Sequence, residues 1–411
     1  MTPTTAGTDL IFEPAAYTDG PPHDRFTWLR ANDPVHRAVT PDGTECWAIT
    51  RHADVVDVSR RTEVFSAAEA GVVLQDLEGD SLASMRKMLL AMDPPTHGLI
   101  RRQVSGEFRA RVIAGLEPRI RAICATIIDA GLERSADAGE VDFVHDVCSL
   151  LPSQILGELM GLPAADWPKL HAMAERNSGG QDPDINPDPA DERSASIEMA
   201  LYAMAFAADR RQMAEQPADL TTVILATEVD GAPMTDPDFG AFFVQLVTAG
   251  NDTTRTMLSS GLDVLLDHPD QLAMLRADPG AIPGAVEEIL RHANPLHYFR
   301  RTAIADTRVG ETPIAAGEKL AMMYTSANRD EDVFTDPHTF DITRDPNPHL
   351  SFGIAEHFCL GVHLARLEGR VFFEELLSRC GSIERTGTTA RQHSNLNNSL
   401  KRLPVCLHPS A

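Results

Sequence analysis

The chain has 411 residues, 43% of them hydrophobic, and its 60 acidic against 36 basic side chains give a net charge of −24. A charge of this sign and size argues against nucleic acid and anionic membrane surfaces as partners. No apolar run is long enough to span a bilayer, and the N-terminal segment lacks the basic stretch and apolar core of a signal peptide. We therefore expect a soluble cytoplasmic protein, with residues 1–411 forming a single domain.

Six cysteines are scattered along the chain without a repeated spacing. This usage is ordinary for a reducing cytoplasm and gives no disulfide framework. All but Cys359 are expected to be inert, small apolar residues. The six are Cys46, Cys124, Cys148, Cys359, Cys380 and Cys406.

In chain order, short strand-like stretches come first and most of the remainder is helical. Strands are predicted at 35–38, 45–50, 307–309 and 319–323, and helical periodicity dominates 98–176, 191–214, 236–268, 269–291 and 360–379. The segment 178–192 is rich in Pro, Gly and Asp. Because helical periodicity resumes at once after it, we interpret it as a mobile loop at the mouth of a site rather than as a domain linker.

Residues 93–102 (DPPTHGLIRR) predict the start of a helix after two prolines. His97 and Arg101 are four residues apart, so both project from one face near the beginning of that helix. Such a face can bind an anion. Considered alone, a solvated basic turn is the alternative explanation.

The helix predicted at 236–268 is strongly apolar, yet it contains the sequence AGNDTT at 249–254. The acid–alcohol pair Asp252 and Thr253 is therefore placed where charge is costly. Gly250 costs roughly 1 kcal/mol of helix propensity relative to Ala, which suggests that something approaches the backbone there. An acid and a hydroxyl can relay protons. The alternative is a polar notch in which Thr253 bonds back to a backbone carbonyl.

Glu288 and Arg291 are three residues apart on one predicted helix face. Exposed pairs of this kind are common and contribute little to stability, so the spacing alone is a weak signal.

The most informative segment is 351–361 (SFGIAEHFCLG), in which Cys359 lies between Gly353 and Gly361. Zinc is a poor fit, because no second cysteine lies at ligand spacing. The segment suits a thiolate on a glycine-rich turn, stabilised by free backbone N–H groups and by the beginning of the helix that follows. A buried structural cysteine is the alternative.

These four segments resemble the motifs of the cytochrome P450 monooxygenases, in particular the soluble bacterial members. Three of them match the family's AGxDTT and ExxR motifs and its histidine–arginine pair, in the family's order, and the resemblance covers nearly the whole chain. The cysteine segment departs from the family's FGxGxHxCLG signature where the second glycine is Ala355, so a reshaped loop is expected there. It matches the signature at Phe352, Gly353, His357, Cys359, Leu360 and Gly361.

The resemblance implies the cytochrome P450 fold, mainly α with a small β lobe. Haem b (iron protoporphyrin IX) would lie between the long central helix and the cysteine loop, with Cys359 as the ligand of its metal. Asp252 and Thr253 would deliver protons to dioxygen, and Arg344 or His349 would join Glu288 and Arg291. The other cofactor-binding residues implied are His97, Arg101, Arg301, Phe352 and His357. Arg300 is the alternative to Arg301, which the RTA sequence that follows favours.

The resemblance also implies that the substrate is a largely apolar small molecule, because the matching contact regions contain no basic cluster. Terpenoids, sterols and branched lipids are favoured, and tailoring of a polyketide or another natural product is the alternative. Tyr298 or Asn398 would offer a hydrogen bond. The substrate-contact candidates are Val72, Val73, Leu74, Met88, Leu89, Val247, Ala249, Leu296, Tyr298 and Phe299.

Electrons are expected from a ferredoxin and its reductase, since the chain has no flavin or iron–sulfur motif. The ferredoxin would dock on a local basic patch near the cysteine loop. Two other classes remain open, a peroxide-driven haem enzyme and a non-catalytic haem-binding protein; the intact pair Asp252–Thr253 disfavours the first. The patch candidates are Arg101, Arg102, Arg109 and Arg111.

Overall fold

Long α-helices make up most of the protein, as the periodicity predicts. The computed structural model describes residues 10–188, 190–229 and 231–410. In this part of the chain no helix is long and apolar enough to cross a membrane. The α-helices are α1 (His23–Asn32), α2 (His52–Arg60), α3 (Gly79–Met85), α4 (Thr96–Val104), α5 (Ala110–Ala114), α6 (Glu117–Ala138), α7 (Leu150–Leu159), α8 (Trp167–Ser178), α9 (Ala190–Gln212), α10 (Leu220–Leu225), α11 (Asp236–Asp267), α12 (Pro269–Ala277), α13 (Ile282–His292), α14 (Tyr324–Ala327) and α15 (Val362–Arg379).

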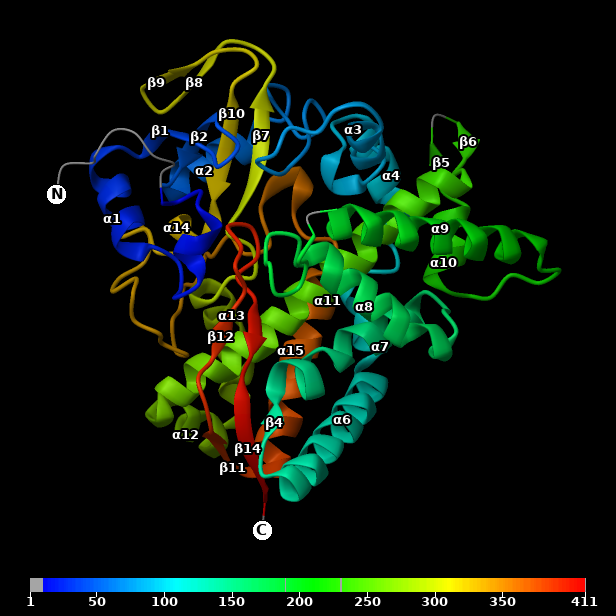
Figure 1. Cartoon of the computed structure of the whole chain (residues 1–411), viewed down its shortest axis with the longest axis vertical. Helices are drawn as coiled ribbons and strands as arrows, with labels where there is room; N and C mark the ends of the chain where they lie inside the picture. Colours follow the sequence, from blue (N-terminus) through cyan, green and yellow to red (C-terminus); the bar gives the residue numbers. More distant parts are fainter. Residues whose placement is uncertain (1–9, 189, 230, 411) are drawn as a thin grey trace.

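The strands of the largest sheet form a small β lobe beside the helices, whereas β4, β11 and β14 lie at the opposite end of the molecule (Figure 1). The lobe's five-stranded sheet has the order β1-β2-β10-β7-β3; β10 pairs with β2 in parallel, and the other pairs are antiparallel. The four predicted strands are confirmed to within one residue. The strands of this sheet are β1 (Val35–Val39), β2 (Glu45–Ile49), β3 (Phe65–Ser66), β7 (Tyr298–Ala303) and β10 (Lys319–Met323). The remaining ones are β4 (Val141–Asp142), β5 (Glu228–Val229), β6 (Ala232–Pro233), β8 (Thr307–Val309), β9 (Thr312–Ile314), β11 (Cys380–Arg385), β12 (Ala390–Arg391), β13 (Leu400–Arg402) and β14 (Pro404–Pro409).

The helix α11 runs through the interior and packs against α7, α8, α9, α13 and α15 (Figure 1). It can do so because it is apolar on nearly all sides, the pattern of a buried helix. Glycines permit its close approach to α15: a Cβ at Gly369 would lie 2.9 Å from Met257 Cε, and one at Gly261 would lie 2.8 Å from Phe373 Cζ. The helix that follows the cysteine loop is thereby fixed against the central helix.

The loop after α8, expected to be mobile, is fastened to the C-terminal part of the chain. Asp182 is fully buried, and its carboxylate accepts hydrogen bonds from the backbone N–H of His393 (2.8 Å) and from Lys401 Nζ. Gln181 Oε1 accepts hydrogen bonds from Ser394 Oγ and the Asn395 N–H. The loop's composition could not indicate this, because its partners lie more than 200 residues away in the sequence.

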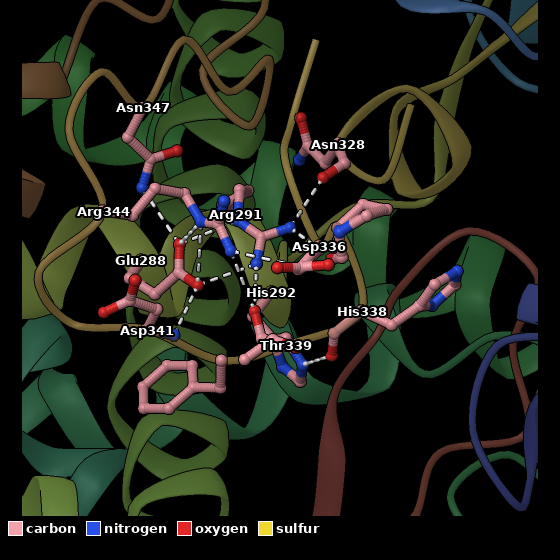
Figure 2. Close-up of polar contacts among 12 residues, drawn as sticks. Glu288, Arg291, His292, Asn328, Asp336, His338, Thr339, Asp341, Arg344 and Asn347 are labelled. Atoms are coloured by element: carbon pink, nitrogen blue, oxygen red, sulfur yellow. Dashed lines mark hydrogen bonds and ion pairs between the residues drawn. The ribbon is translucent and has the colours of Figure 1, made fainter. Parts of the chain in front are cut away.

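The predicted pair Glu288–Arg291 is fully buried and lies at the centre of a polar cluster (Figure 2). Two hydrogen bonds of 2.7 Å join the guanidinium to the carboxylate. Arg344 is the third partner, with Nε 3.2 Å from Glu288 Oε2, whereas His349 pairs with Glu287. Arg291 also donates to the carbonyls of Asn328, Pro337 and Thr339, and Glu288 accepts from the Asp341 N–H and Asn347 Nδ2.

We predict that Arg291→Met lowers the free energy of unfolding by about 3–5 kcal/mol, because it leaves the Glu288 carboxylate buried with fewer partners. Urea denaturation followed by circular dichroism measures the change. Arg308→Met, which removes one side of the exposed pair Arg308–Glu311 on β8–β9, is the matched control and should leave the urea midpoint unchanged. Equal losses in both variants would contradict the assignment.

Candidate active site

The cysteine loop (residues 351–361) precedes α15. It has little regular structure and is held by hydrogen bonds within the loop. The Cys359 N–H donates to the Phe352 carbonyl at 2.8 Å, and a short 3₁₀ helix spans Ala355–His357. Phe352 packs against the main hydrophobic core, and the Arg366 guanidinium lies 5.0 Å from the centre of its ring. Cys359 is half-buried as a residue, so the loop does not enclose it completely.

Ala355 takes the left-handed conformation that glycine adopts easily, with φ at +59°. Gly353, two residues earlier, is also left-handed, with φ at +65°. The departure from the resembled signature is therefore accommodated by local backbone strain of about 1–2 kcal/mol at one residue. The Cβ of Ala355 can be tolerated because the residue is exposed.

Several groups act on the sulfur of Cys359. Burial raises the pKa of its thiol, while the Gly361 N–H and the guanidinium groups of Arg101 and Arg366 act in the opposite direction. Donors and cations around a sulfur favour its thiolate form. The site can thus hold a thiolate when a further positive charge is bound to the sulfur.

Beside the cysteine lies a cluster of two histidines and two arginines, which we call the basic cluster (His97, Arg101, Arg301 and His357). The His97 and His357 rings are 4.3 Å apart, and Arg101 donates to the carbonyl of Phe358, next to Cys359. The Nε2 atoms of both histidines are buried and have no hydrogen-bond partner. These unsatisfied donors can bind an anion.

The electrostatics of the basic cluster support this interpretation. Burial, together with Arg101 and Arg301, lowers the pKa of His97 to about 4, and burial, Arg301, His97 and Arg101 lower that of His357 to about 2. The Glu356 carboxylate lies 4.0 Å from His97 Nδ1. Both histidines are therefore neutral at pH 7, and each can offer an N–H.

A cavity of about 350 Å³ opens next to the basic cluster. It lies between α4 and the cysteine loop, and its walls include two arginine side chains. The lining residues are His97, Gly98, Arg101, Arg102, Ser105, Ala355 and Glu356.

Strand alternation separates the two arginines of β7. Arg300 Nη1 lies 2.9 Å from Asp76 Oδ1, so its charge is already paired. Arg301 is buried, donates to the carbonyl of Arg300, and forms none of the ion pairs in the described part of the chain. Residues two apart share a face of a strand, so Phe299 lies on the side of Arg301. Tyr298 lies on the opposite side.

In α11 the acid and the alcohol face different surroundings. Ala249 is exposed and Thr253 half-buried, so the helix is open on one side at this level. Thr253 Oγ1 donates to the Ala249 carbonyl at 2.6 Å, the back-bond considered as the alternative. Asp252 is buried and pairs with Arg255 one turn later, and it also accepts from Ser399 Oγ at 3.0 Å.

The substrate-contact candidates divide by accessibility. Tyr298 packs in a core cluster with the N-terminal segment, and its hydroxyl accepts from the Leu74 N–H at 3.2 Å. Asn398 is buried and donates to the Asn294 carbonyl. Exposed or half-buried are Val73, Met88, Ala249, Leu296 and Phe299, and buried are Val72, Leu74, Leu89, Val247 and Tyr298.

Sequence reasoning missed the partners of Asp252. Arg255 follows at the i,i+3 spacing of a helical ion pair, which was a usable signal. Ser399 and Glu175, which binds Arg255 at 3.2 Å, come from distant segments without a sequence pattern that links them.

Comparisons with known proteins identify the family of this chain. The cytochrome P450 family model matches residues 192–401. Three relatives cover most of the chain. The steroid C26-monooxygenase of Mycolicibacterium smegmatis is 35% identical over 93% of this chain and 90% of its own. The methyl-branched lipid omega-hydroxylase of Mycobacterium tuberculosis is 37% identical over 88% and 84%. The linalool 8-monooxygenase of Pseudomonas putida is 34% identical over 96% and 98%.

A solved structure is similar along nearly its whole length. The Mycobacterium marinum cytochrome P450 in complex with pseudoionone has a TM-score of 0.86 and 37% sequence identity, and the match covers 93% of this chain and 94% of that one. Proteins of this family are haem-thiolate enzymes. The chain therefore belongs to the cytochrome P450 family, and it is a haem-dependent monooxygenase with the mainly α fold of that family.

Proposed function

We propose that this enzyme hydroxylates an apolar small molecule of the terpenoid, steroid or methyl-branched lipid class, using dioxygen and electrons from a ferredoxin. The observation that carries the proposal is a half-buried cysteine, Cys359, beside a basic cluster with unsatisfied donors. The named relatives act on a steroid, a methyl-branched lipid and linalool, which supports the substrate class.

The residues fit haem b. Cys359 would supply the sulfur that binds its metal, and the basic cluster would supply donors for its two propionate groups. Arg301 is buried without a carboxylate partner among the described residues, and an unpaired buried cation is costly. An anion bound there would remove that cost. We assign Cys359 as the metal ligand, and His97, Arg101, Arg301 and His357 to the propionates.

Bound haem supplies the redox centre at which dioxygen is activated, and the overall reaction consumes a C–H substrate, O₂, two electrons and two protons to give an alcohol and water. The polypeptide must supply the protons and protect the sulfur. Thr253 holds a water through its hydroxyl on the open side of α11, and Asp252 is the nearby acid. Phe352, sandwiched between Arg366 and the core, shields the sulfur from solvent.

The accessible residues among the substrate-contact candidates are apolar. Phe299 shares a strand face with Arg301, and Ala249 lies one turn before Thr253 on the open side of α11. We assign substrate contacts to these two residues with Val73 and Leu296. Leu89 and Val247 are buried in one hydrophobic cluster and form the layer behind them. Tyr298 contributes its backbone to the sheet rather than its hydroxyl to the substrate.

The ferredoxin would dock over α4 and α5. Arg101 contacts the cysteine loop directly, Arg102 lines the adjacent cavity, and Arg109 and Arg111 are exposed. In a chain with a net charge of −24, this local excess of positive charge can steer an acidic partner toward the cysteine loop.

We expect the reduced protein with carbon monoxide to show the strongly red-shifted Soret band of a thiolate-ligated haem. Cys359→Ser should abolish this band, because a serine hydroxyl does not replace the thiolate. Cys406→Ser is the control, since Cys406 is the other cysteine that is not fully buried. A red-shifted band that survives in Cys359→Ser would overturn the ligand assignment.

The substrate class is tested by titrating the ferric enzyme with a steroid, a methyl-branched fatty acid and linalool, followed by product analysis with a ferredoxin, its reductase and NADH. A shift toward high spin and a hydroxylated product are expected for at least one of them. Binding and turnover of a macrolide instead would favour natural-product tailoring. Product formed with hydrogen peroxide alone, at the rate seen with the reductase, would favour a peroxide-driven enzyme.

We predict that Arg109→Glu together with Arg111→Glu slows reduction by a [2Fe–2S] ferredoxin about tenfold or more at low ionic strength, because steering depends on charge. Stopped-flow absorbance measures the rate. Neither side chain forms an ion pair in the described residues, so the change breaks no contact. Arg308→Glu, on the distant β8–β9 hairpin, should have no effect, and an unchanged rate in the double variant argues against this docking surface.

A further inference from the structure

Both oxygens of the Asp252 carboxylate are held in the structure. Arg255 binds Oδ1 from the next turn of α11, and Ser399 Oγ donates to Oδ2 at 3.0 Å from the residue before β13. The Ser399 hydroxyl is also 2.7 Å from Thr256 Oγ1, which fixes its position. All four residues are buried.

The two groups that hold Asp252 are themselves anchored to the last turn of α8. Arg255 Nη1 donates to Glu175 Oε1 at 3.2 Å. The Ser399 carbonyl accepts from the Gln392 N–H at 2.8 Å, and Gln392 Nε2 donates to the Ser178 carbonyl at 3.1 Å. A cavity of about 10 Å³, room for one water, lies among Glu175, Ser178, Asp252 and Arg255. The end of α8 is thus linked to the acid by two separate routes.

This arrangement points the carboxylate away from the open side of α11. Successive residues of an α-helix are rotated by about 100°, so Asp252 and Thr253 face different directions. Thr253 and Ala249 lie on the open side, whereas the partners of Asp252 lie on α8 and the C-terminal segment. As held, the acid cannot reach the side of Thr253 without releasing a partner.

We propose that Ser399 is a positioning residue that, with Arg255, retains the Asp252 carboxylate toward the end of α8. This inference rests on the proposed function, in which Asp252 delivers protons. It adds a residue from the C-terminal segment to the control of that step.

The first test needs no turnover. In infrared difference spectra of the ferric holoenzyme, the carboxylate band assigned by its loss in Asp252→Asn should change frequency in Ser399→Ala and return in Ser399→Thr, which keeps the hydroxyl. Ser260→Ala is the matched control: this serine is equally buried on α11, and its hydroxyl has no partner. An unchanged band in Ser399→Ala overturns the proposal.

The second test uses turnover with saturating substrate and ferredoxin. Loss of the Ser399 hydroxyl should shift the Asp252 carboxylate toward conformations that face Thr253. Proton delivery then limits the rate less, so the solvent isotope effect on product formation should fall by about twofold in Ser399→Ala, with KM unchanged. Thr253→Ala is the comparison for impaired proton delivery, and this variant should release excess hydrogen peroxide in place of product. An unchanged or larger isotope effect contradicts the inference.

If Ser399→Ala does not fold, Ser399→Cys keeps the size with a weaker donor and should show part of both changes. Failure of the proposed function is distinguishable, because an enzyme that hydroxylates none of the tested compounds would still give the infrared result. A shifted carboxylate band in Ser399→Ala, in an enzyme without turnover, would confirm the contact with Asp252 and contradict the proposed reaction.

Discussion

The buried pair Glu288–Arg291 is the interaction on which the position of the active site depends. The cysteine loop has little regular structure, so its start must be fixed from outside. Arg291 binds the carbonyls of Asn328, Pro337 and Thr339, and Glu288 binds the Asp341 N–H and Arg344. Asn328 in turn binds the Leu350 N–H and Ser351, where the cysteine loop begins, and Ser351 Oγ donates to the Leu290 carbonyl. A buried ion pair is weak evidence for added stability but can specify one arrangement; here it aligns the irregular segment 328–351 with α13.

The charge beside the cysteine loop is opposite in sign to the net charge of the chain. The protein is strongly acidic overall, yet the region between α4, β7 and the cysteine loop concentrates arginines and histidines with few carboxylates. Such a region is unfavourable when empty, because burial and the neighbouring cations oppose each positive charge. An anionic cofactor removes this penalty, so haem binding and folding of the region are thermodynamically coupled. One of these cations, Arg101, also favours the ionised form of the Cys359 thiol, together with Arg366.

Asp252 belongs to a second polar network, separate from the basic cluster. This network joins α8, α11 and the segment 392–399 across the protein and includes the fastened loop after α8. Polar networks of this kind must be nearly fully satisfied to be tolerated in the interior. Asp252 meets this requirement through Arg255 and Ser399, at the cost of pointing away from the open side of its helix. The contacts that satisfy Asp252 therefore also fix the direction in which its carboxylate points.

The sequence alone determined the helical content, the strands β1, β2, β8 and β10, the family and the motif residues, because periodicity and short motifs are local properties of the chain. The left-handed backbone of Ala355 and the choice of Arg344 over His349 needed the structure, since both depend on how loops pack. The accessibility of Phe299 rather than Tyr298 was set by strand alternation within a sheet whose neighbours are distant in sequence. The contacts of Asp252 with Ser399 and of Asp182 with His393 were likewise invisible, because they join segments more than 140 residues apart. Only tertiary packing brings such groups together, and hydrogen bonds formed there leave no periodic trace in the sequence.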